Sequence, residues 1–169
     1  MKLEALNRLP AAEAAQAFER CCGSKAWVKG MNAARPFKDR KALFAAAERV
    51  AKSLGRADWL EAFSHHPKIG DRESLGARLG AAAAWAADEQ RGADAASVVT
   101  LHGLAQGNRS YEERFGYIFI VCASGRSADE LFVELQKRLK NDPEKELENA
   151  AREQRAITRL RLEKLLKEE

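Results

Sequence analysis

The chain has 169 residues, which is enough for one domain with a buried core; 46% of them are hydrophobic and 32% are charged. These fractions are typical of a folded globular protein. No apolar run approaches the roughly 18–20 residues of a membrane-spanning helix, so we expect no membrane association. The net charge of +4 is mild, and basic residues are mixed with acidic ones, which argues against a basic arm that binds nucleic acid.

The amino-acid usage favours helix and a reducing compartment. Alanine is abundant, β-branched residues are few, and there are only four prolines. Cys21 and Cys22 are adjacent and Cys122 is distant, so the cysteines make a poor disulfide framework and predict a cytoplasmic protein. Because the chain has no internal repeat, low-complexity linker or domain boundary, we predict a single domain over residues 1–169.

The first predicted helix begins at Pro10, because proline fits the first turn of a helix. It runs to about Cys22, and Gly23 ends it. Trp27 and Val28 then lead into a predicted loop through Met31, Asn32, Arg35 and Pro36.

A second helix is predicted after Asp39, which is a candidate N-cap. Apolar residues recur at helical spacing from there up to Leu54, and Gly55 follows. A short helix containing Trp59 and Phe63 then leads to the most informative stretch of the chain.

That stretch is residues 64–70, Ser-His-His-Pro-Lys-Ile-Gly. Pro67 removes a backbone donor and biases His66 away from helical dihedrals, and Gly70 allows the chain to turn. We therefore expect His66 at a helix end, where its imidazole can face a pocket. Imidazole is the side chain whose unperturbed pKa suits acid and base work near neutral pH.

Two other interpretations of the histidines compete with catalysis. A lone histidine before proline is commonly a turn residue. His65 is the neighbouring catalytic candidate, but consecutive residues at a helix end point in different directions. A zinc site needs three or four ligands at usable spacing, and His65, His66 and His102 with a distant cysteine do not provide it, so we predict no metal.

Residues 71–80 are polar and contain glycine, which indicates a loop over the site, and residues 81–91 read as helix. Asp88, Glu89 and Gln90 lie near the end of that helix. Such a triplet is commonly a solvated charged turn. Alternatively, Glu89 and Gln90 lie about 100° apart on the helix and could flank one ligand.

The next predicted helix runs from Ala95 to about Tyr111. Residues 115–123 then form the one run with strand-like composition, which could be a buried extended segment or an apolar helix. Ser127 with a glutamate three residues later matches a capping box and opens a helix through Leu139. Asp142–Pro143 predicts the start of a last helix that continues almost to the end.

Arg161 stands out on this last helix. At about 100° per residue it falls inside the apolar arc, whereas Arg159 falls on the far side. The arc comprises Leu147, Ala150, Gln154, Ile157, Leu162 and Leu165. A buried guanidinium is costly without a partner, so Arg161 is a candidate clamp for a carboxylate or a ureido carbonyl. An internal salt bridge or a snorkelling side chain is the alternative.

Several short motifs occur together, and in this order the chain resembles the family of 2-oxo-4-hydroxy-4-carboxy-5-ureidoimidazoline (OHCU) decarboxylases of urate breakdown. The motifs are Cys22-Gly23-Ser24-Lys25-Ala26-Trp27, Arg35-Pro36-Phe37, His66-Pro67-Lys68-Ile69-Gly70, Glu89-Gln90, Asn108-Arg109-Ser110-Tyr111, Phe115-Gly116-Tyr117-Ile118-Phe119-Ile120, Gly125-Arg126-Ser127, Arg138-Leu139 with Asn141-Asp142, and Ile157 through Leu162.

The resemblance implies an all-α, single-domain multi-helix bundle, usually a homodimer, that acts as a carboxy-lyase without a metal or organic cofactor. It implies that OHCU is converted to (S)-allantoin and CO2, with His66 as the catalytic acid–base residue and Glu89 as its partner. The residues that would line the substrate pocket are Pro67, Gln90, Phe119, Ile120, Val121, Cys122, Ala123 and Arg161.

One position departs from the family pattern. Members often have serine three residues before the Glu-Gln pair, and this chain has Ala86, which alters a predicted substrate contact. Ala86 supports an alternative, a related helical enzyme that acts on another ureido or imidazoline acid. A second alternative is a non-enzymatic basic helical module, for which the dispersed charge gives little support.

Overall fold

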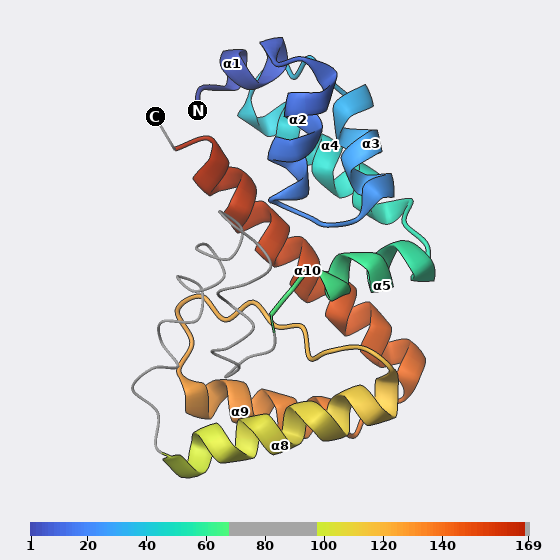
Figure 1. The fold of residues 1–169 in the computed structure, drawn as a ribbon, viewed down its shortest axis with the longest axis vertical. Helices are drawn as coiled ribbons and strands as arrows, with labels where there is room; N and C mark the ends of the chain where they lie inside the picture. The colour runs from blue at the N-terminus through green and yellow to red at the C-terminus, as the bar shows by residue number, and fades with distance from the viewer. Residues whose placement is uncertain (68–97, 168–169) are drawn as a thin grey trace. The chain divides into compact units, whose positions relative to one another are not determined.

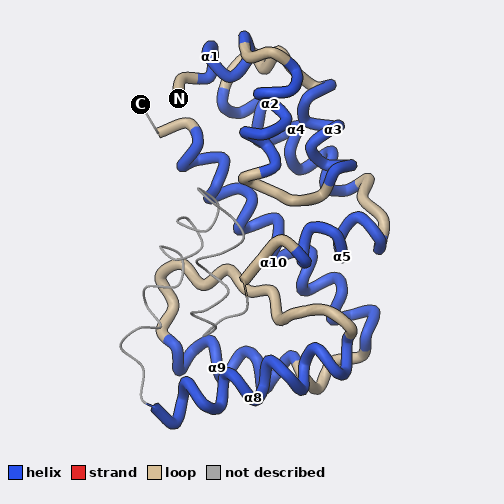
Figure 2. Tube along the Cα trace, viewed as in Figure 1, coloured by secondary structure: helices blue, strands red, loops and turns tan. Residues whose placement is uncertain are grey.

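A computed structural model describes residues 1–67 and 98–167, and the regular secondary structure within these ranges is entirely helical (Figure 2). This confirms the all-α prediction for that part of the chain. The helices are α1 (Leu3–Arg8), α2 (Ala11–Glu19), α3 (Lys25–Ala33), α4 (Arg40–Lys52), α5 (Arg56–Ser64), α8 (Val98–Phe115), α9 (Ala128–Arg138) and α10 (Pro143–Leu165).

The chain divides into two compact units. The first unit comprises Met1–His65 together with the chain from Gln154 onward, and the second comprises His66–Glu153. A single domain over 1–169 therefore stays a prediction. None of the helices that the structure describes is both long and apolar enough to cross a membrane.

In the first unit, α2, α3 and α4 pack together around an apolar core (Figure 1). Trp27 on α3 is buried against Phe18 on α2, with ring centroids 6.1 Å apart in an edge-to-face arrangement. The indole N–H of Trp27 donates to the carbonyl of Ala47 on α4 at 3.3 Å. Burial of a large aromatic side chain whose polar atom is also paired fixes these three helices to one another.

The predicted loop is wrong at Met31 and Asn32, which lie in α3, whereas Arg35 and Pro36 lie outside regular secondary structure as predicted. The side chain of Ser24 is the N-cap of α3, where Oγ accepts the backbone N–H of Trp27 at 3.3 Å. Serine at this position supplies one of the acceptors that the first turn of a helix lacks.

The helix predicted from Pro10 to Cys22 is shorter in the structure, and the preceding helix α1 was not predicted. Pro10 is the non-helical N-cap residue of α2 rather than its first residue, with φ −50° and ψ 149°. At the other end, the N–H of Cys21 bonds to the carbonyl of Phe18 three residues earlier, which tightens the chain after Glu19.

The predictions for the next two helices are confirmed. Asp39 caps α4 by accepting the N–H of Ala42 at 2.7 Å, although α4 ends at Lys52, before Leu54. The short helix that leads to the histidines is α5, whose first turn contains Asp58, and Asp58 accepts the N–H of Gly55 at 2.9 Å.

In the second unit, α8 and α9 lie side by side (Figure 1). The helix α8 continues to Phe115, beyond the predicted end near Tyr111. Ser127 and Glu130 form the predicted capping box at the start of α9. The prediction that α10 begins at Pro143 is also confirmed.

Residues 116–123, which follow α8, adopt no regular secondary structure although most of them are buried. The helical alternative is therefore wrong for this segment. The alternative, a buried extended segment, is confirmed in its burial, but the segment pairs with no strand in the described ranges.

Candidate active site

His66 lies just outside α5, as the sequence predicts. The helix ends at Ser64, His65 is its C-cap residue, and the chain leaves the helix at His66 before Pro67. The side chains of His66 and Pro67 are half-buried. An imidazole at this place is neither sealed in a core nor fully solvated, which suits proton transfer.

The predicted site residues Ala86, Glu89 and Gln90 lie outside the described residues, as do the predicted loop 71–80 and helix 81–91. The roles assigned to these three residues remain predictions. Among the described residues, no group of three His, Cys, Asp or Glu side chains is placed to hold a metal ion.

Arg161 is buried in the first unit, with 5% of its surface exposed, whereas Arg159 is exposed. The helical-wheel prediction for both residues is confirmed. The positive charge of Arg161 acts on the thiol of Cys22 and favours its ionised form. Burial acts more strongly in the other direction and raises the pKa of Cys22 above its ordinary value of 9.0, so the thiol stays protonated at neutral pH and is a poor nucleophile.

The predicted substrate-lining segment, residues 119–123, lies in the second unit. Phe119, Ile120, Val121 and Ala123 are buried, and Cys122 is half-buried. Side chains from two helices hold its backbone. Nη1 of Arg138 donates to the carbonyl of Ile120 at 2.7 Å. The N–H of Cys122 donates to Oε2 of Glu153 at 2.8 Å.

Arg138 belongs to a buried polar cluster that sequence reasoning missed. Its Nε donates to Oε1 of Glu146 at 2.7 Å, and the two side chains are 2% and 0% exposed. The hydroxyl of Tyr111 donates to the same carboxylate oxygen. The amide of Asn141 donates to Oε2 at 2.8 Å. Every oxygen of the buried carboxylate is thus hydrogen-bonded, as a buried ion pair requires.

Arg138 and Tyr111 each keep one protonation state across ordinary pH. Burial lowers the pKa of Arg138, but hydrogen bonding and the charge of Glu146 outweigh it and the net shift is upward. Burial, followed by the hydrogen bond to Glu146, raises the pKa of Tyr111 far above its ordinary value of 10.0. Arg138 is therefore a cation, and Tyr111 a neutral donor, at every pH that an enzyme assay uses.

Helical periodicity could have located Glu146. It precedes Ala150 by four residues and Gln154 by eight, so it borders the same apolar arc that singled out Arg161. Glu153 precedes Ile157 by four residues and borders the same arc, but periodicity does not show that its partner is the N–H of Cys122, 31 residues earlier in the sequence.

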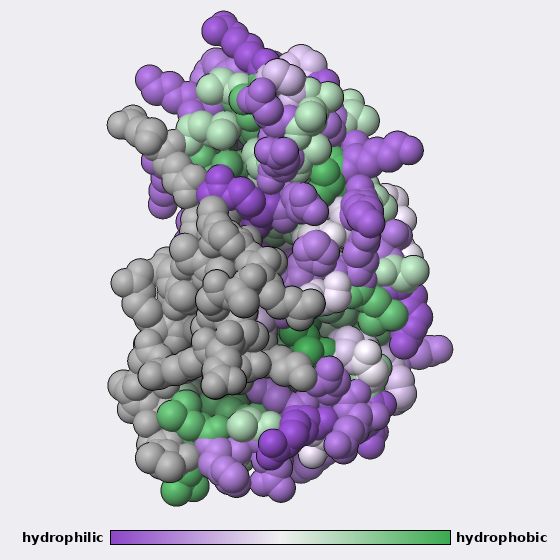
Figure 3. All heavy atoms as spheres, in the orientation of Figure 1, coloured by the Kyte–Doolittle hydropathy of each residue, from purple (hydrophilic) through white to green (hydrophobic). Residues whose placement is uncertain are grey.

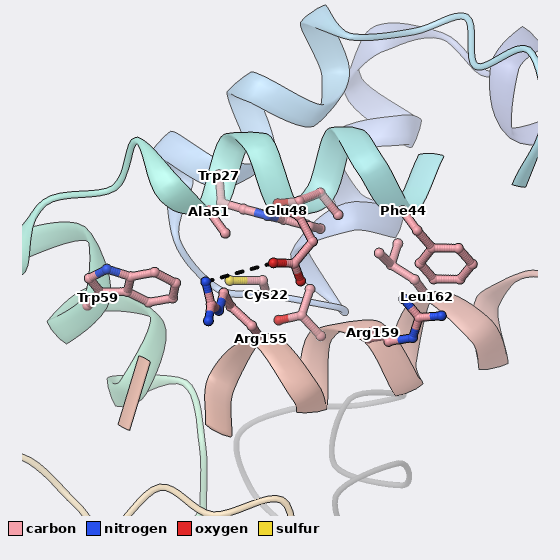
Figure 4. A pocket seen from close by; sticks show the side chains of 11 residues that line it. Cys22, Trp27, Phe44, Glu48, Ala51, Trp59, Arg155, Arg159 and Leu162 are labelled. Atoms are coloured by element: carbon pink, nitrogen blue, oxygen red, sulfur yellow. Dashed lines mark hydrogen bonds and ion pairs between the residues drawn. The ribbon is translucent and has the colours of Figure 1, made fainter. Parts of the chain in front are cut away.

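A pocket in the first unit is lined by residues of α4, α5 and α10 together with Cys22 and Trp27 (Figure 4). Glu48 and Arg155 face each other across it and form an ion pair at 3.8 Å. The guanidinium of Arg159 lies over the ring of Phe44, 4.6 Å from its centre. None of the predicted site residues that the structure describes is among the residues that line it.

Comparisons with known proteins agree with this picture. The chain is 39% identical over 145 residues to the uric acid degradation bifunctional protein TTL of Arabidopsis thaliana, covering 86% of this chain and 45% of that longer protein. It is 31% identical over 137 residues to the OHCU decarboxylase of Amia calva, covering 78% of this chain and 75% of that enzyme.

Among solved structures, a crystal structure of OHCU decarboxylase in the presence of (S)-allantoin matches with a TM-score of 0.76 and 38% identity. The match covers 89% of this chain and 97% of that one. The model of the OHCU decarboxylase family matches residues 7–163, so the chain belongs to this family of carboxy-lyases.

Proposed function

We propose that this chain decarboxylates OHCU to (S)-allantoin and CO2, as a step of urate degradation. The observation that carries the proposal is the family match over residues 7–163, a range that includes His66, Arg161 and the segment 119–123. The solved relative with the matching fold was crystallised in the presence of (S)-allantoin, which is the product of this reaction.

The substrate can supply its own electron sink. It carries a carboxylate and a hydroxyl on one ring carbon, next to a C=N carbon. When the bond to the carboxylate breaks, CO2 leaves and the electron pair moves toward the C=N group. The nitrogen takes up a proton and an enol results; a second proton is then added to one face of the former C=N carbon, while the hydroxyl loses its proton and becomes the ring carbonyl. The protein has to orient the anion and deliver that second proton stereospecifically.

We assign the proton transfer to His66, with Glu89 orienting the imidazole and disfavouring the ground-state carboxylate. Arg161 and Gln90 hold the ureido or ring carbonyl groups. Pro67, Ala86 and the backbone of residues 119–123 line the pocket. The half-buried position of His66 beyond the helix end and the burial of Arg161 support these roles. The two side-chain hydrogen bonds that fix the backbone of residues 119–123 support the assignment of this segment to the pocket lining.

Ala86 favours a second candidate, the same chemistry on another ureido or imidazoline acid, because a serine contact is absent at that position. The binding-module alternative predicts clustered surface Lys and Arg. On the face that Figure 3 draws, hydrophilic side chains are instead interspersed with apolar ones over α1 to α4.

We further propose that the protein acts as a homodimer in the cytoplasm. The family resemblance supports the dimer, and the three free cysteines support a reducing compartment. Light scattering coupled to size-exclusion chromatography tests the dimer through the mass of the eluted species.

A stereochemical turnover assay tests the activity. OHCU is generated in the cuvette from urate, the protein is added, and optical activity is followed together with CO2 release. We expect rapid formation of (S)-allantoin. The variant His66→Ala should lose roughly 10²–10⁴-fold in kcat, which is the usual contribution of a general acid–base residue.

His102→Ala is the matched control, because His102 is exposed on α8 and belongs to no part of the proposed site. It should turn over like the unmodified protein. Slow racemic product from the unmodified protein, at the spontaneous rate, would contradict the proposal and favour another ureido acid as substrate.

A further inference from the structure

The ring of His65 packs directly on the backbone of Gly23. A Cβ atom at Gly23 would lie 2.3 Å from Cγ of His65 and 2.7 Å from its Nδ1. Carbon atoms do not approach so closely without displacement, so position 23 admits no side chain while His65 keeps its place. His65 is the C-cap residue of α5 and immediately precedes His66.

A second contact joins the same two segments. The backbone N–H of Lys25 donates to Oε2 of Glu61 at 2.9 Å, and Nζ of Lys25 lies 3.5 Å from Oε1. Glu61 and His65 are four residues apart, so they share one face of the last turn of α5. Residues 23–25 therefore contact the last turn of α5 at both of its ends.

The turn formed by Cys22–Lys25 is itself fixed to the core of the first unit. Cys22 and Ser24 are buried, and Ser24 caps α3 through the N–H of Trp27. Trp27 is in turn bonded to α4. The surface on which His65 rests is consequently a rigid part of the packed interior rather than a mobile loop.

We propose that the turn Cys22–Lys25 positions the proton-transfer residue, with Gly23 and His65 acting as positioning residues for His66. This inference rests on the proposed function of His66. A shift of the His65 ring rotates the end of α5 and carries His66 with it. Misplacement of a catalytic group by about 1 Å can cost on the order of 10²-fold in rate.

The central test is Gly23→Ala, assayed at a temperature where circular dichroism shows the variant to be folded. We expect kcat to fall by at least about tenfold with a smaller change in KM, because substrate-binding groups elsewhere are untouched. His65→Ala alone removes the ring that rests on Gly23 without creating an overlap, and it should lower kcat in the same direction.

Two further glycine substitutions serve as matched controls. At Gly30 a Cβ would lie 2.5 Å from Cγ1 of Val50, so Gly30→Ala creates a similar overlap between α3 and α4, away from His65. At Gly55, the other end of α5, the nearest atom is Oδ2 of Asp58 at 3.7 Å, an ordinary contact. We expect Gly30→Ala to lower stability but keep kcat, and Gly55→Ala to keep kcat with only the small stability loss of alanine at a helix N-cap.

The NMR resonances of the His66 imidazole provide a readout that does not need turnover. Gly23→Ala should shift them and change their pH titration, whereas Gly30→Ala should not. If Gly23→Ala does not fold, Glu61→Ala removes the other contact without an overlap and should move the same resonances.

The inference is overturned if folded Gly23→Ala has the kcat and the His66 resonances of the unmodified protein. It is also overturned if Gly30→Ala loses as much kcat, since the effect would then be one of general packing. Failure of the proposed function looks different. In that case the unmodified protein shows no turnover, or His66→Ala is fully active, while the His66 resonances still report on the turn.

Discussion

The two units secure their backbones by different means. In the first unit, polar side chains such as Ser24 and Asp39 act locally as helix caps, and the apolar core around Trp27 also holds one buried guanidinium, that of Arg161. The second unit buries a charged pair, Arg138 and Glu146, whose hydrogen bonds reach an irregular segment. The difference follows from backbone chemistry. A helix satisfies most of its own N–H and C=O groups, whereas a buried irregular segment needs partners from elsewhere.

The largest effect that separates the units is expected from Arg138→Met. This change leaves Glu146 buried without its cation and removes the donor to Ile120. Breaking one side of a buried ion pair usually costs about 3–5 kcal/mol. Urea unfolding should show a loss of that order. A loss below about 1 kcal/mol would mean that the pair contributes little and that apolar packing dominates in both units.

The second prediction separates the units by pH. The folded protein holds the protons of Cys22 and Tyr111 more tightly than the unfolded chain does, because both pKa values are raised on folding. Each group's contribution to the free energy of unfolding is therefore complete below its ordinary pKa, which is 9.0 for Cys22 and 10.0 for Tyr111. Each contribution is lost as the pH rises above that value.

Unfolding free energies measured between about pH 8 and about pH 11 test this prediction. Stability should fall with rising pH. Cys22→Ala should flatten the part of the decline that begins near pH 9.0, and Tyr111→Phe the part that begins near pH 10.0. An unchanged slope in either variant would contradict the corresponding assignment.

The smallest predicted effect is one that the two units should share. Asp39→Ala removes the cap of α4, and Ser127→Ala removes the cap of α9. Each should cost about 1 kcal/mol, because each loses one side-chain bond to a first-turn N–H. Thermal unfolding of both variants provides the measurement. A much larger loss for Ser127→Ala would show that the cap of α9 is coupled to the buried cluster at the other end of that helix.

These differences also explain what could be predicted from sequence. Asp39, Ser127 and Pro143 act within one helical turn, so their residue types alone locate the helix starts. The position of Arg161 followed from periodicity, which is also a local property. Ser24 carries the same kind of local signal, although α3 itself is not among the helices that the sequence predicts.

What could not be predicted depends on contacts between distant segments. The partner of Arg138 could not be inferred, since sequence does not show which carboxylate meets which guanidinium. The contact of Gly23 with His65 joins residues 42 positions apart, and glycine after a helix is otherwise typical of a helix end. The motif that contains Gly23 is part of the family resemblance. The physical reason for a glycine at this position, the contact with the His65 ring, is visible only in the fold.

The packing of glycines in this protein has a consequence for attempts to make it more heat-resistant. Replacing a glycine by alanine is a common stabilising substitution, because it reduces the freedom of the unfolded chain. At Gly23, Gly30, Gly103 and Gly107, however, the added methyl group would come within 2.8 Å of a neighbouring side chain. Gly116 and Gly125 have positive φ angles that disfavour any other residue. Gly55 has room for a methyl group but is the N-cap of α5, where alanine is disfavoured, so none of the described glycines is a good target for this substitution.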